Sequence, residues 1–243
     1  MNLVLIEARE LDGASCATLT DVRARHVREV LGLRVGSRFR VGVIDGAQGV
    51  AEIVAVDEAS IHIACTLEAS IAEPPRIDLV LALPRPKVLA RLLSPIAQLG
   101  VRRLILTGAW KVERFYFDAH ILEPQEHVPK LIEGLAQARD TRLPIVSVHR
   151  SLAYLLDEEL DALVEGAARV VVDPSAAPSL ESIVASQTAA RLVLAIGPEG
   201  GFTARELDHL ASRGFASASL GPRVLRSDVA TIAALSRASA VPR

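Results

Sequence analysis

The sequence predicts an α/β fold with a mostly parallel sheet over its larger, carboxyl-terminal part, preceded by a small β-rich unit. Strand-like and helix-like segments alternate from residue 77 onward, which is typical of parallel strands joined by crossover helices. Residues 1 to about 70 instead contain several short segments with alternating polarity. The stretch Ser70-Ile71-Ala72-Glu73-Pro74-Pro75 separates the two patterns. Its prolines hold the chain extended, so we expect a linker there.

Composition narrows the class of protein. The chain has 243 residues, of which 50% are hydrophobic, and a net charge of −2; this is enough for a packed core. Its apolar runs are shorter than a membrane span, and its start has neither basic residues nor a small-residue cleavage site. We therefore expect a cytoplasmic protein without a membrane partner. Cys16 and Cys65 form no Cys-x-x-Cys pair, and the six histidines lack metal-ligand spacing, so we expect no metal.

The β-rich unit is expected to be a small barrel. An amphipathic pattern over 20–31 predicts one helix, and Asp45-Gly46 is a turn dipeptide. The predicted strands are Asn2–Ile6, Ser37–Ile44, Val50–Val56 and Ser60–Leu67.

In the α/β part, apolar runs and helical periodicities alternate. Gly100 should end the first helix, and Pro95 inside it should cause a kink or a new start. The predicted strands are Ile77–Leu83, Arg103–Thr107, Ile145–Val148 and Arg169–Val172, and the predicted helices are Lys87–Leu99, Glu126–Arg139 and Leu152–Val164.

The last fifty residues contain the pattern strand, glycine loop and helix twice. The buried strand 192–196 stops at Gly197-Pro198-Glu199-Gly200-Gly201, and Thr203 with Glu206 forms a capping box for a helix that ends at Gly214. The strand 217–220 leads into a second loop over 221–226, after which Ser227 should cap a last helix through Ser236. Both loops therefore emerge at the same end of a parallel sheet.

A ligand site is expected at that end, because backbone amides and helix amino termini converge at the carboxyl ends of parallel strands. No Lys-Ser or Lys-Thr follows the first loop, and Gly-x-Gly-x-x-Gly is absent from both, so nucleotide phosphates are not the expected ligand. The groups available there suit an adenine and a small uncharged or zwitterionic body. They are backbone donors and the apolar residues Ile196, Leu220, Val224 and Leu225. Glycine at these turns allows the backbone to fold closely around a ligand.

The two motifs Ile196-Gly197-Pro198-Glu199-Gly200-Gly201-Phe202 and Leu220-Gly221-Pro222-Arg223-Val224-Leu225-Arg226 resemble those of the ribosomal small-subunit methyltransferase E family. These are uracil-N3 methyltransferases of 16S rRNA in the SPOUT class. The resemblance implies a PUA-like β-barrel domain over residues 1–72 and an α/β SPOUT domain with a deep trefoil knot over residues 73–243. It also implies bound S-adenosylmethionine, a homodimer, and 16S rRNA or the small ribosomal subunit as partner.

Candidate site residues follow from these motifs. The expected cofactor-binding residues are Ala195, Ile196, Gly197, Pro198, Gly200, Gly201, Leu220, Gly221, Val224, Leu225 and Ser227. Uracil N3 is protonated at neutral pH, so a base must remove its proton or a cation must stabilise the anion. Arg226 is the candidate cation, although it could instead pair with Asp228; Glu199 and Asp228 are candidate bases, or acceptors of backbone amides at a helix start.

RNA contacts are expected from clustered arginines. Basic residues gather between Arg23 and Arg40, and two more lie in Ala138-Arg139-Asp140-Thr141-Arg142. The candidates are Arg23, Arg25, Arg28, Arg38, Arg139 and Arg142. For each the alternative is structural: a solvated arginine face, or a helix carboxyl terminus that favours arginine.

The chain also departs from the family pattern. Pro95 and Gln98 stand where many members have Lys and Glu, and Ser227-Asp228-Val229 replaces a common Thr-Glu-Thr. Asp for Glu keeps the charge and Ser for Thr keeps the hydroxyl, so cofactor binding should survive, and the departures bear on the choice of RNA target. Two alternatives remain: a SPOUT methyltransferase acting on another rRNA or tRNA nucleotide, and a non-catalytic RNA-binding assembly factor. A Rossmann dehydrogenase is disfavoured because its glycine fingerprint is missing.

Overall fold

The computed structural model describes residues 3–242. The chain divides into two compact units, Met1–Pro74 with Ile132–Leu143, and Pro75–Leu131 with Pro144–Arg243. The boundary near residue 74 falls within the linker expected from the prolines. The segment Ile132–Leu143 was not expected in the first unit, because it lies far along the chain.

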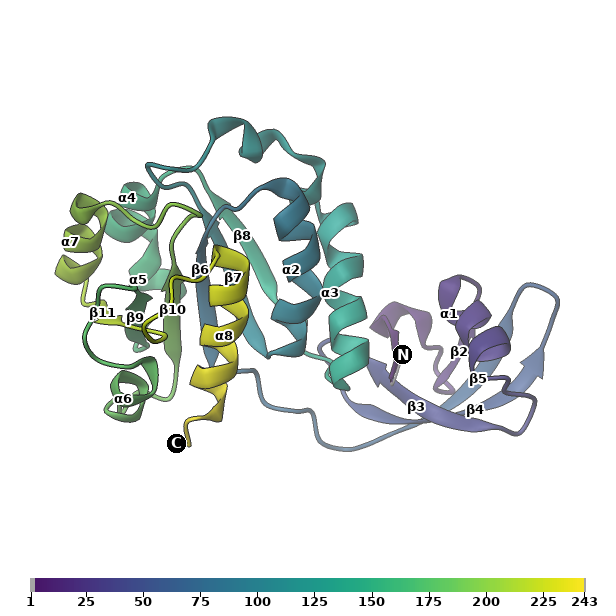
Figure 1. The fold of residues 1–243 in the computed structure, drawn as a ribbon. Helices are drawn as coiled ribbons and strands as arrows, with labels where there is room; N and C mark the ends of the chain where they lie inside the picture. The colour runs from purple at the N-terminus through teal and green to yellow at the C-terminus, as the bar shows by residue number, and fades with distance from the viewer. Residues whose placement is uncertain (1–2, 243) are drawn as a thin grey trace. The chain divides into compact units, whose positions relative to one another are not determined.

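The first unit is a curled, mixed sheet of five strands (Figure 1). Its order is β1 (Val4–Ile6), β3 (Arg38–Val43), β4 (Gln48–Val56), β5 (Ile61–Leu67) and β2 (Cys16–Leu19). β1 pairs with β3 in parallel, and the other neighbours pair antiparallel. Because no ladder joins β1 to β2 among residues 3–242, the sheet is a half-barrel, which is less than the small barrel expected from the sequence.

Local structure in this unit differs from the sequence prediction at two places. The four-residue strand β2 was missed because it is too short for a clear alternating pattern. The predicted helix over 20–31 is a short α1 (Val22–Arg25) that continues as a π-helical turn, His26–Val30. Asn2, included in the first predicted strand, lies outside the described residues.

The later segment joins the first unit through Thr141, which is fully buried. Its hydroxyl donates to the Gly46 carbonyl at 2.8 Å, and its methyl group occupies the space beside Gly42, where a Cβ would lie 2.6 Å from it. The backbone N–H of Leu3 also donates to the carbonyl of Ala136 at 3.1 Å. These contacts explain why residues so distant in sequence share one core.

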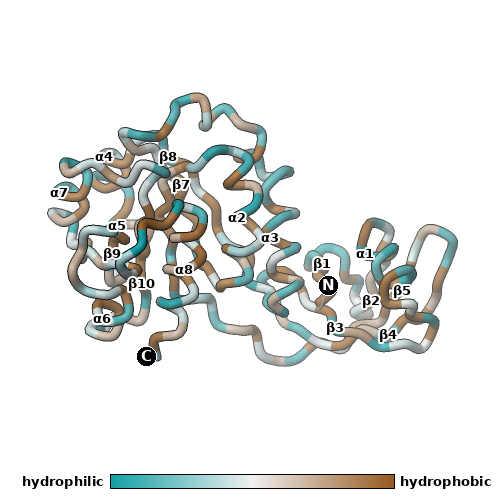
Figure 2. Tube along the Cα trace, in the orientation of Figure 1, coloured by the Kyte–Doolittle hydropathy of each residue, from teal (hydrophilic) through white to brown (hydrophobic). Residues whose placement is uncertain are grey.

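The second unit contains a six-stranded, wholly parallel sheet, which confirms the predicted fold class for this part. The order is β11 (Ala216–Ala218), β9 (Ala168–Val172), β10 (Leu192–Ile196), β6 (Ile77–Ala82), β7 (Val101–Thr107) and β8 (Ile145–His149). The strand interiors are strongly hydrophobic (Figure 2). This pattern is expected where helices cover both faces of a parallel sheet.

Helices cover both faces of this sheet (Figure 1). The helix bounds along the chain are α2 (Pro86–Gln98), α3 (Pro124–Ala138), α4 (Leu152–Tyr154), α5 (Leu160–Leu163), α6 (Leu180–Ala185), α7 (Ala204–Ser212) and α8 (Ser227–Ala240), with a π-helical turn at Leu155–Glu159 and 3-10 turns at Ala8–Glu10, Arg114–Asp118 and His120–Leu122. One core joins Val80 and Val193 of the strands to Leu155 and Leu210 of the helices. α8 packs against α2, α6 and β10.

Two helix details differ from the sequence prediction. α2 runs through Pro95, so no new helix starts there: the proline removes one N–H, but the flanking Leu92, Leu93 and Ile96 are buried and hold the helix in place. Ser227 is the first helical residue of α8, and its N-cap is Arg226, without a side-chain cap. By contrast, the Thr203–Glu206 capping box is confirmed.

Membrane spans and metal clusters are both absent from residues 3–242. No helix there is both long and apolar enough to cross a membrane. No group of three or more His, Cys, Asp or Glu side chains in the same range is placed to hold a metal ion.

Close strand packing predicts that substitutions to alanine at two glycines differ sharply in their effect on stability. A Cβ on Gly49 would lie 2.1 Å from the Thr66 carbonyl oxygen, whereas a Cβ on Gly13 would meet nothing within 4 Å. We expect Gly49→Ala to lower the free energy of unfolding by about 1–3 kcal/mol, because backbone must move. Gly13→Ala should stay within about 0.5 kcal/mol of the parent. Urea denaturation measures both, and equal midpoints for the two variants would contradict the packing described.

Candidate functional site

The site is built at the carboxyl ends of three neighbouring strands. β9 lies between β10 and β11, and the ladders place Val172 opposite both Ile196 and Ala218. The three strands thus end at one level, so the loops that follow them start side by side. This edge of a parallel sheet is where ligands bind in α/β folds.

A cavity of about 390 Å³ opens between these loops, a size within the range of small-molecule sites. Its walls combine apolar side chains with exposed backbone. The lining residues are Val172, Asp173, Pro174, Ser175, Ile196, Gly197, Pro198, Glu199, Gly200, Gly201, Phe202, Leu207, Leu220, Gly221, Arg223, Val224, Leu225, Ser227 and Ala230.

The loop after β10 is held by backbone geometry and by Lys111. Gly201 has a φ of +69°, and its N–H donates to the Pro198 carbonyl at 2.8 Å. A Cβ on Gly197 would lie 3.0 Å from the backbone nitrogen of Phe202, so the turn requires a small residue there. The Lys111 ammonium donates to the Gly200 carbonyl at 2.6 Å. Both ends of the turn are therefore fixed.

The loop after β11 is also held by its backbone. Gly221 has a φ of +111°, which only glycine adopts readily, and its N–H donates to the Ser219 hydroxyl at 3.0 Å. Arg237 of α8 donates to the Leu220 carbonyl at 2.9 Å. Val224, 85% exposed, stands at the rim of the cavity.

The structure brings almost all of the expected cofactor residues together. The ten from Ile196 to Ser227 line the cavity, whereas Ala195 is fully buried in the core beside the strands. The loop from Asp173 to Ser175 was missed, and so was Arg223. Asp173-Pro174-Ser175 directly follows a predicted strand, as the other two loops do, and this position was a signal for it.

The three catalytic candidates differ in position. Glu199 lines the cavity, and its carboxylate lies 3.3 Å from the Arg85 guanidinium. Arg226 is 73% exposed and pairs with Asp228 at 3.0 Å, and neither residue lines the cavity. The other Asp228 oxygen accepts the N–H of Val229 at 3.0 Å, at the start of α8. The structural alternatives considered for Arg226 and Asp228 are both present, and either residue would have to turn to reach a substrate in the cavity.

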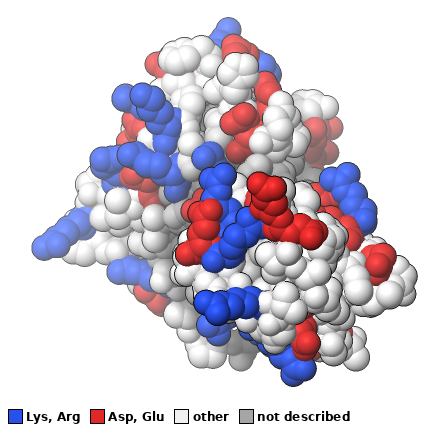
Figure 3. Space-filling model, turned by 90° about the vertical axis from the view of Figure 1, so that its right-hand side faces the viewer, with Lys and Arg blue, Asp and Glu red and all other residues white. Residues whose placement is uncertain are grey.

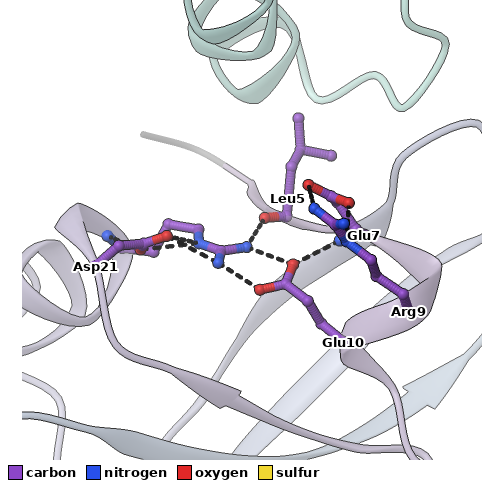
Figure 4. Close-up of polar contacts among 6 residues, drawn as sticks. Leu5, Glu7, Arg9, Glu10 and Asp21 are labelled. Atoms are coloured by element: carbon purple, nitrogen blue, oxygen red, sulfur yellow. Dashed lines mark hydrogen bonds and ion pairs between the residues drawn. The ribbon is translucent and has the colours of Figure 1, made fainter. Parts of the chain in front are cut away.

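Among the RNA-binding candidates, Arg23 lies in an ion-pair network. Figure 4 labels its partners Leu5, Glu10 and Asp21. It bonds Glu10 at 2.6 Å and Asp21 at 2.9 Å, and it donates to the Leu5 carbonyl at 2.8 Å. The hydrogen bond from Arg23 lowers the pKa of the Glu10 carboxyl, and the same bond raises the pKa of Arg23. With 17% of its side chain exposed, Arg23 has little room for RNA.

Most of the other candidates also have protein partners. Arg28 donates to the Glu58 carbonyl at 2.7 Å, Arg38 to the Glu52 carboxylate at 2.9 Å, and Arg142 to the Ala72 carbonyl at 2.6 Å. Arg25 and Arg139 are exposed, and Arg139 has a φ of +58°. On the face drawn in Figure 3, basic and acidic side chains are interspersed.

The chain belongs to the class of RNA methyltransferases, because residues 72–239 match the family described as RNA methyltransferase domain. Within that class, the chain belongs to the ribosomal RNA small subunit methyltransferase E family. It is 30% identical over 236 residues to "Ribosomal RNA small subunit methyltransferase E" of Treponema pallidum, covering 96% of this chain and 89% of that protein. A Borreliella burgdorferi relative, "Ribosomal RNA small subunit methyltransferase E 1", is 25% identical, covering 96% and 95%.

Solved structures show the same fold. A ribosomal RNA small subunit methyltransferase E from Neisseria gonorrhoeae, bound to S-adenosyl methionine, aligns with a TM-score of 0.78 and 20% identity over 97% of this chain and 95% of that one. A Legionella pneumophila protein in complex with the cofactor SAM aligns with a TM-score of 0.79 and 21% identity over 98% and 97%.

The network around Arg23 predicts a stability effect. Because the pKa of Glu10 is lowered in the fold, its contribution to stability is present above its ordinary value of 4.5 and is lost as the pH falls through the lowered pKa. Arg23→Met should lower the free energy of unfolding at pH 7 by about 1.5–3 kcal/mol. It should also flatten the fall in stability between pH 5 and pH 3, roughly the window of carboxyl titration.

Thermal and urea unfolding of parent and variant across this pH range measure both effects. The matched control is Arg25→Met, which alters an exposed arginine of the same helix. If Arg23→Met were as stable as Arg25→Met, the structural role of Arg23 would be wrong.

Proposed function

We propose that the protein transfers a methyl group from S-adenosylmethionine to N3 of one uridine in 16S rRNA of the small ribosomal subunit. Family membership supports an RNA methyltransferase. The relatives' names support small-subunit rRNA as the substrate, and structural neighbours with bound S-adenosyl methionine support the cofactor. The observation that carries the proposal for this chain is the cavity enclosed by three adjacent loops at the carboxyl edge of the sheet.

The residues of this cavity fit such a cofactor. Ile196, Leu207 and Leu225 offer apolar surface for an adenine, and the glycine loops offer backbone groups for the polar edges of the molecule. Asp173 and Glu199 carry carboxylates at the cavity wall, where an amino group or a sulfonium would be attracted. The eleven residues from Ala195 to Ser227 named above are the proposed cofactor-binding set. Ala195 does not line the cavity, and it supports the cavity from the core.

When bound, S-adenosylmethionine supplies a methyl group on a positively charged sulfur. The chain then has to exclude water and hold the uracil in line with that methyl group, and such positioning supplies much of the rate enhancement in reactions of this kind. Val224 and Leu225 at the rim are placed to exclude water.

The uracil also has to lose the proton on N3. We propose that Arg226 stabilises the resulting negative charge on O2 or O4, and that Glu199 or Asp228 accepts the proton. The exposed ion pair of Arg226 with Asp228 is worth little energetically. Arg226 can therefore leave it when a substrate arrives.

Three further features belong to the same proposal. We propose a trefoil knot in the second unit on the ground of family membership. We propose that the half-barrel of residues 1–72 is PUA-like, and that the first unit contacts RNA through Arg25 and Arg139, with smaller contributions from Arg23, Arg28, Arg38 and Arg142.

We also propose a homodimer, with the exposed Val229 and Ile232 of α8 at its interface.

The substrate assignment is tested by methyl transfer from labelled S-adenosylmethionine to small ribosomal subunits purified from a strain lacking this gene. We expect the label in 3-methyluridine. Label in another nucleoside would show that the protein methylates a different target, and the uridine assignment would be wrong. Absence of label with cofactor binding intact would favour a different RNA acceptor, and absence of cofactor binding as well would favour the assembly-factor alternative.

Cofactor binding is tested by Gly200→Val. Gly200 lines the cavity, and a Cβ there would lie 2.9 Å from the Lys111 side chain, which can move aside, so the fold should survive while the cavity wall changes shape. We expect at least a tenfold loss of affinity for S-adenosylmethionine by isothermal calorimetry, which corresponds to about 1.4 kcal/mol. Gly13→Val, outside the cavity, is the control. Normal affinity in Gly200→Val would remove Gly200 from the site.

A further inference from the structure

A second hollow lies beside the cofactor cavity in the second unit. Its volume is about 990 Å³, and we call it the Trp110 groove. It is bordered by the segments that follow β7 and β8 and by the start of α7. Its lining residues are Gly108, Ala109, Trp110, Val112, Arg114, Phe117, Arg150, Ser151, Leu152, Ala153, Asp157, Thr203, Arg205, Glu206 and His209.

Trp110 is the main feature of this groove. It is the only tryptophan of the chain, and 83% of it is exposed. Its backbone N–H donates to the Glu206 carboxylate at 2.7 Å, so the position of the residue is fixed although its ring is uncovered. A large aromatic side chain held at the surface in this way presents a flat face for a partner.

The charges of the groove favour an anionic partner. The side chains of Arg114 and Arg205 are exposed and form no ion pair or hydrogen bond among residues 3–242. Arg150 lies over the Phe117 ring at 5.4 Å, and it has only an exposed contact with Asp118. The two carboxylates of the lining are already in use.

Those two carboxylates have internal partners. Glu206 accepts from Thr203 in the capping box as well as from Trp110, and Asp157 accepts from His209 at 2.8 Å. The three arginines of the lining, Arg114, Arg150 and Arg205, therefore outnumber its two carboxylates, whose oxygens already have hydrogen-bond donors within the chain.

The groove and the cofactor cavity share one loop. Gly197 to Phe202 line the cavity, and Thr203 lines the groove. Next to Trp110, Lys111 donates to the Gly200 carbonyl at 2.6 Å, which ties the groove segment to the cavity wall. A chain lying in the groove would thus pass directly beside the cavity.

We propose that single-stranded RNA next to the target nucleotide binds in the Trp110 groove, with one base stacked on Trp110 and phosphates on Arg114 and Arg205. This inference rests on the proposed function. Stacking on an aromatic ring combined with a basic groove is how proteins hold single strands without reading their sequence. Most arginines of the first unit have protein partners, whereas these two do not.

Because Trp110 is the sole tryptophan, its fluorescence reports on the groove alone. We would titrate the protein with single-stranded decauridylate and, in parallel, with an RNA duplex of the same length. Stacking predicts quenching of the emission by the single strand and much weaker quenching by the duplex. Absence of quenching at RNA concentrations that saturate binding would overturn the proposal.

Variants separate stacking from charge. By anisotropy of labelled decauridylate, Trp110→Leu should weaken binding by on the order of tenfold. Arg114→Gln and Arg205→Gln should each lower the slope of log affinity against log salt by about 0.7. Arg91→Gln, which removes an exposed arginine of α2 outside the groove, should change neither quantity.

Two further measurements distinguish the failures. Affinity for S-adenosylmethionine should be the same in Trp110→Leu and the parent. If the parent itself did not bind S-adenosylmethionine, the proposed function would be wrong. Quenching of Trp110 by RNA would still support RNA binding in the groove. If sedimentation showed that Trp110→Leu converts a dimer to a monomer, and RNA gave no quenching, the groove would belong to a second copy of the chain and the proposal would be overturned.

Discussion

The site depends on the position of β9 between β10 and β11, and on the level at which the three strands end. Val172, Ile196 and Ala218 lie opposite one another in the parallel ladders. Since each strand points the same way, the loops that follow must meet at one edge. A shift of register by one residue would turn the side chains of a strand to the other face and move its loop away from the others.

This constraint also explains why the cavity is made largely of backbone. Loops that start so close together have little space for side chains, and the turns use glycine with positive φ at Gly201 and Gly221. Such a wall offers amides and carbonyls at fixed positions, with few titratable groups. A site of this kind is suited to holding a cofactor and aligning it, and less to acid–base chemistry. In the proposed mechanism, proton removal then falls on a carboxylate such as Glu199 at the cavity wall, and Arg226 stabilises the negative charge left on the uracil.

Much of the second unit could be predicted from the sequence, because its strands are continuous apolar runs and its turns contain glycine or a capping pair. The Thr203–Glu206 box was found in this way, whereas the full set of ten cavity residues came from the two glycine-loop motifs and their resemblance to the family. Partners that are remote in sequence were not predictable. Nothing near Arg23 indicates that Glu10 would neutralise it, and nothing near Thr141 indicates that it would fill the space beside Gly42. The Trp110 groove was missed for the same reason, since three distant segments form it.

Hydrogen–deuterium exchange of the full chain, with and without S-adenosylmethionine, tests most directly whether the three loops act together as the wall of one cofactor site. Ligands that bind the native state protect the backbone that they contact or order. We expect slower exchange in 173–175, 197–203 and 221–226 together, with little change in β3 to β5. Protection confined to one loop, or located in the first unit instead, would contradict a shared wall.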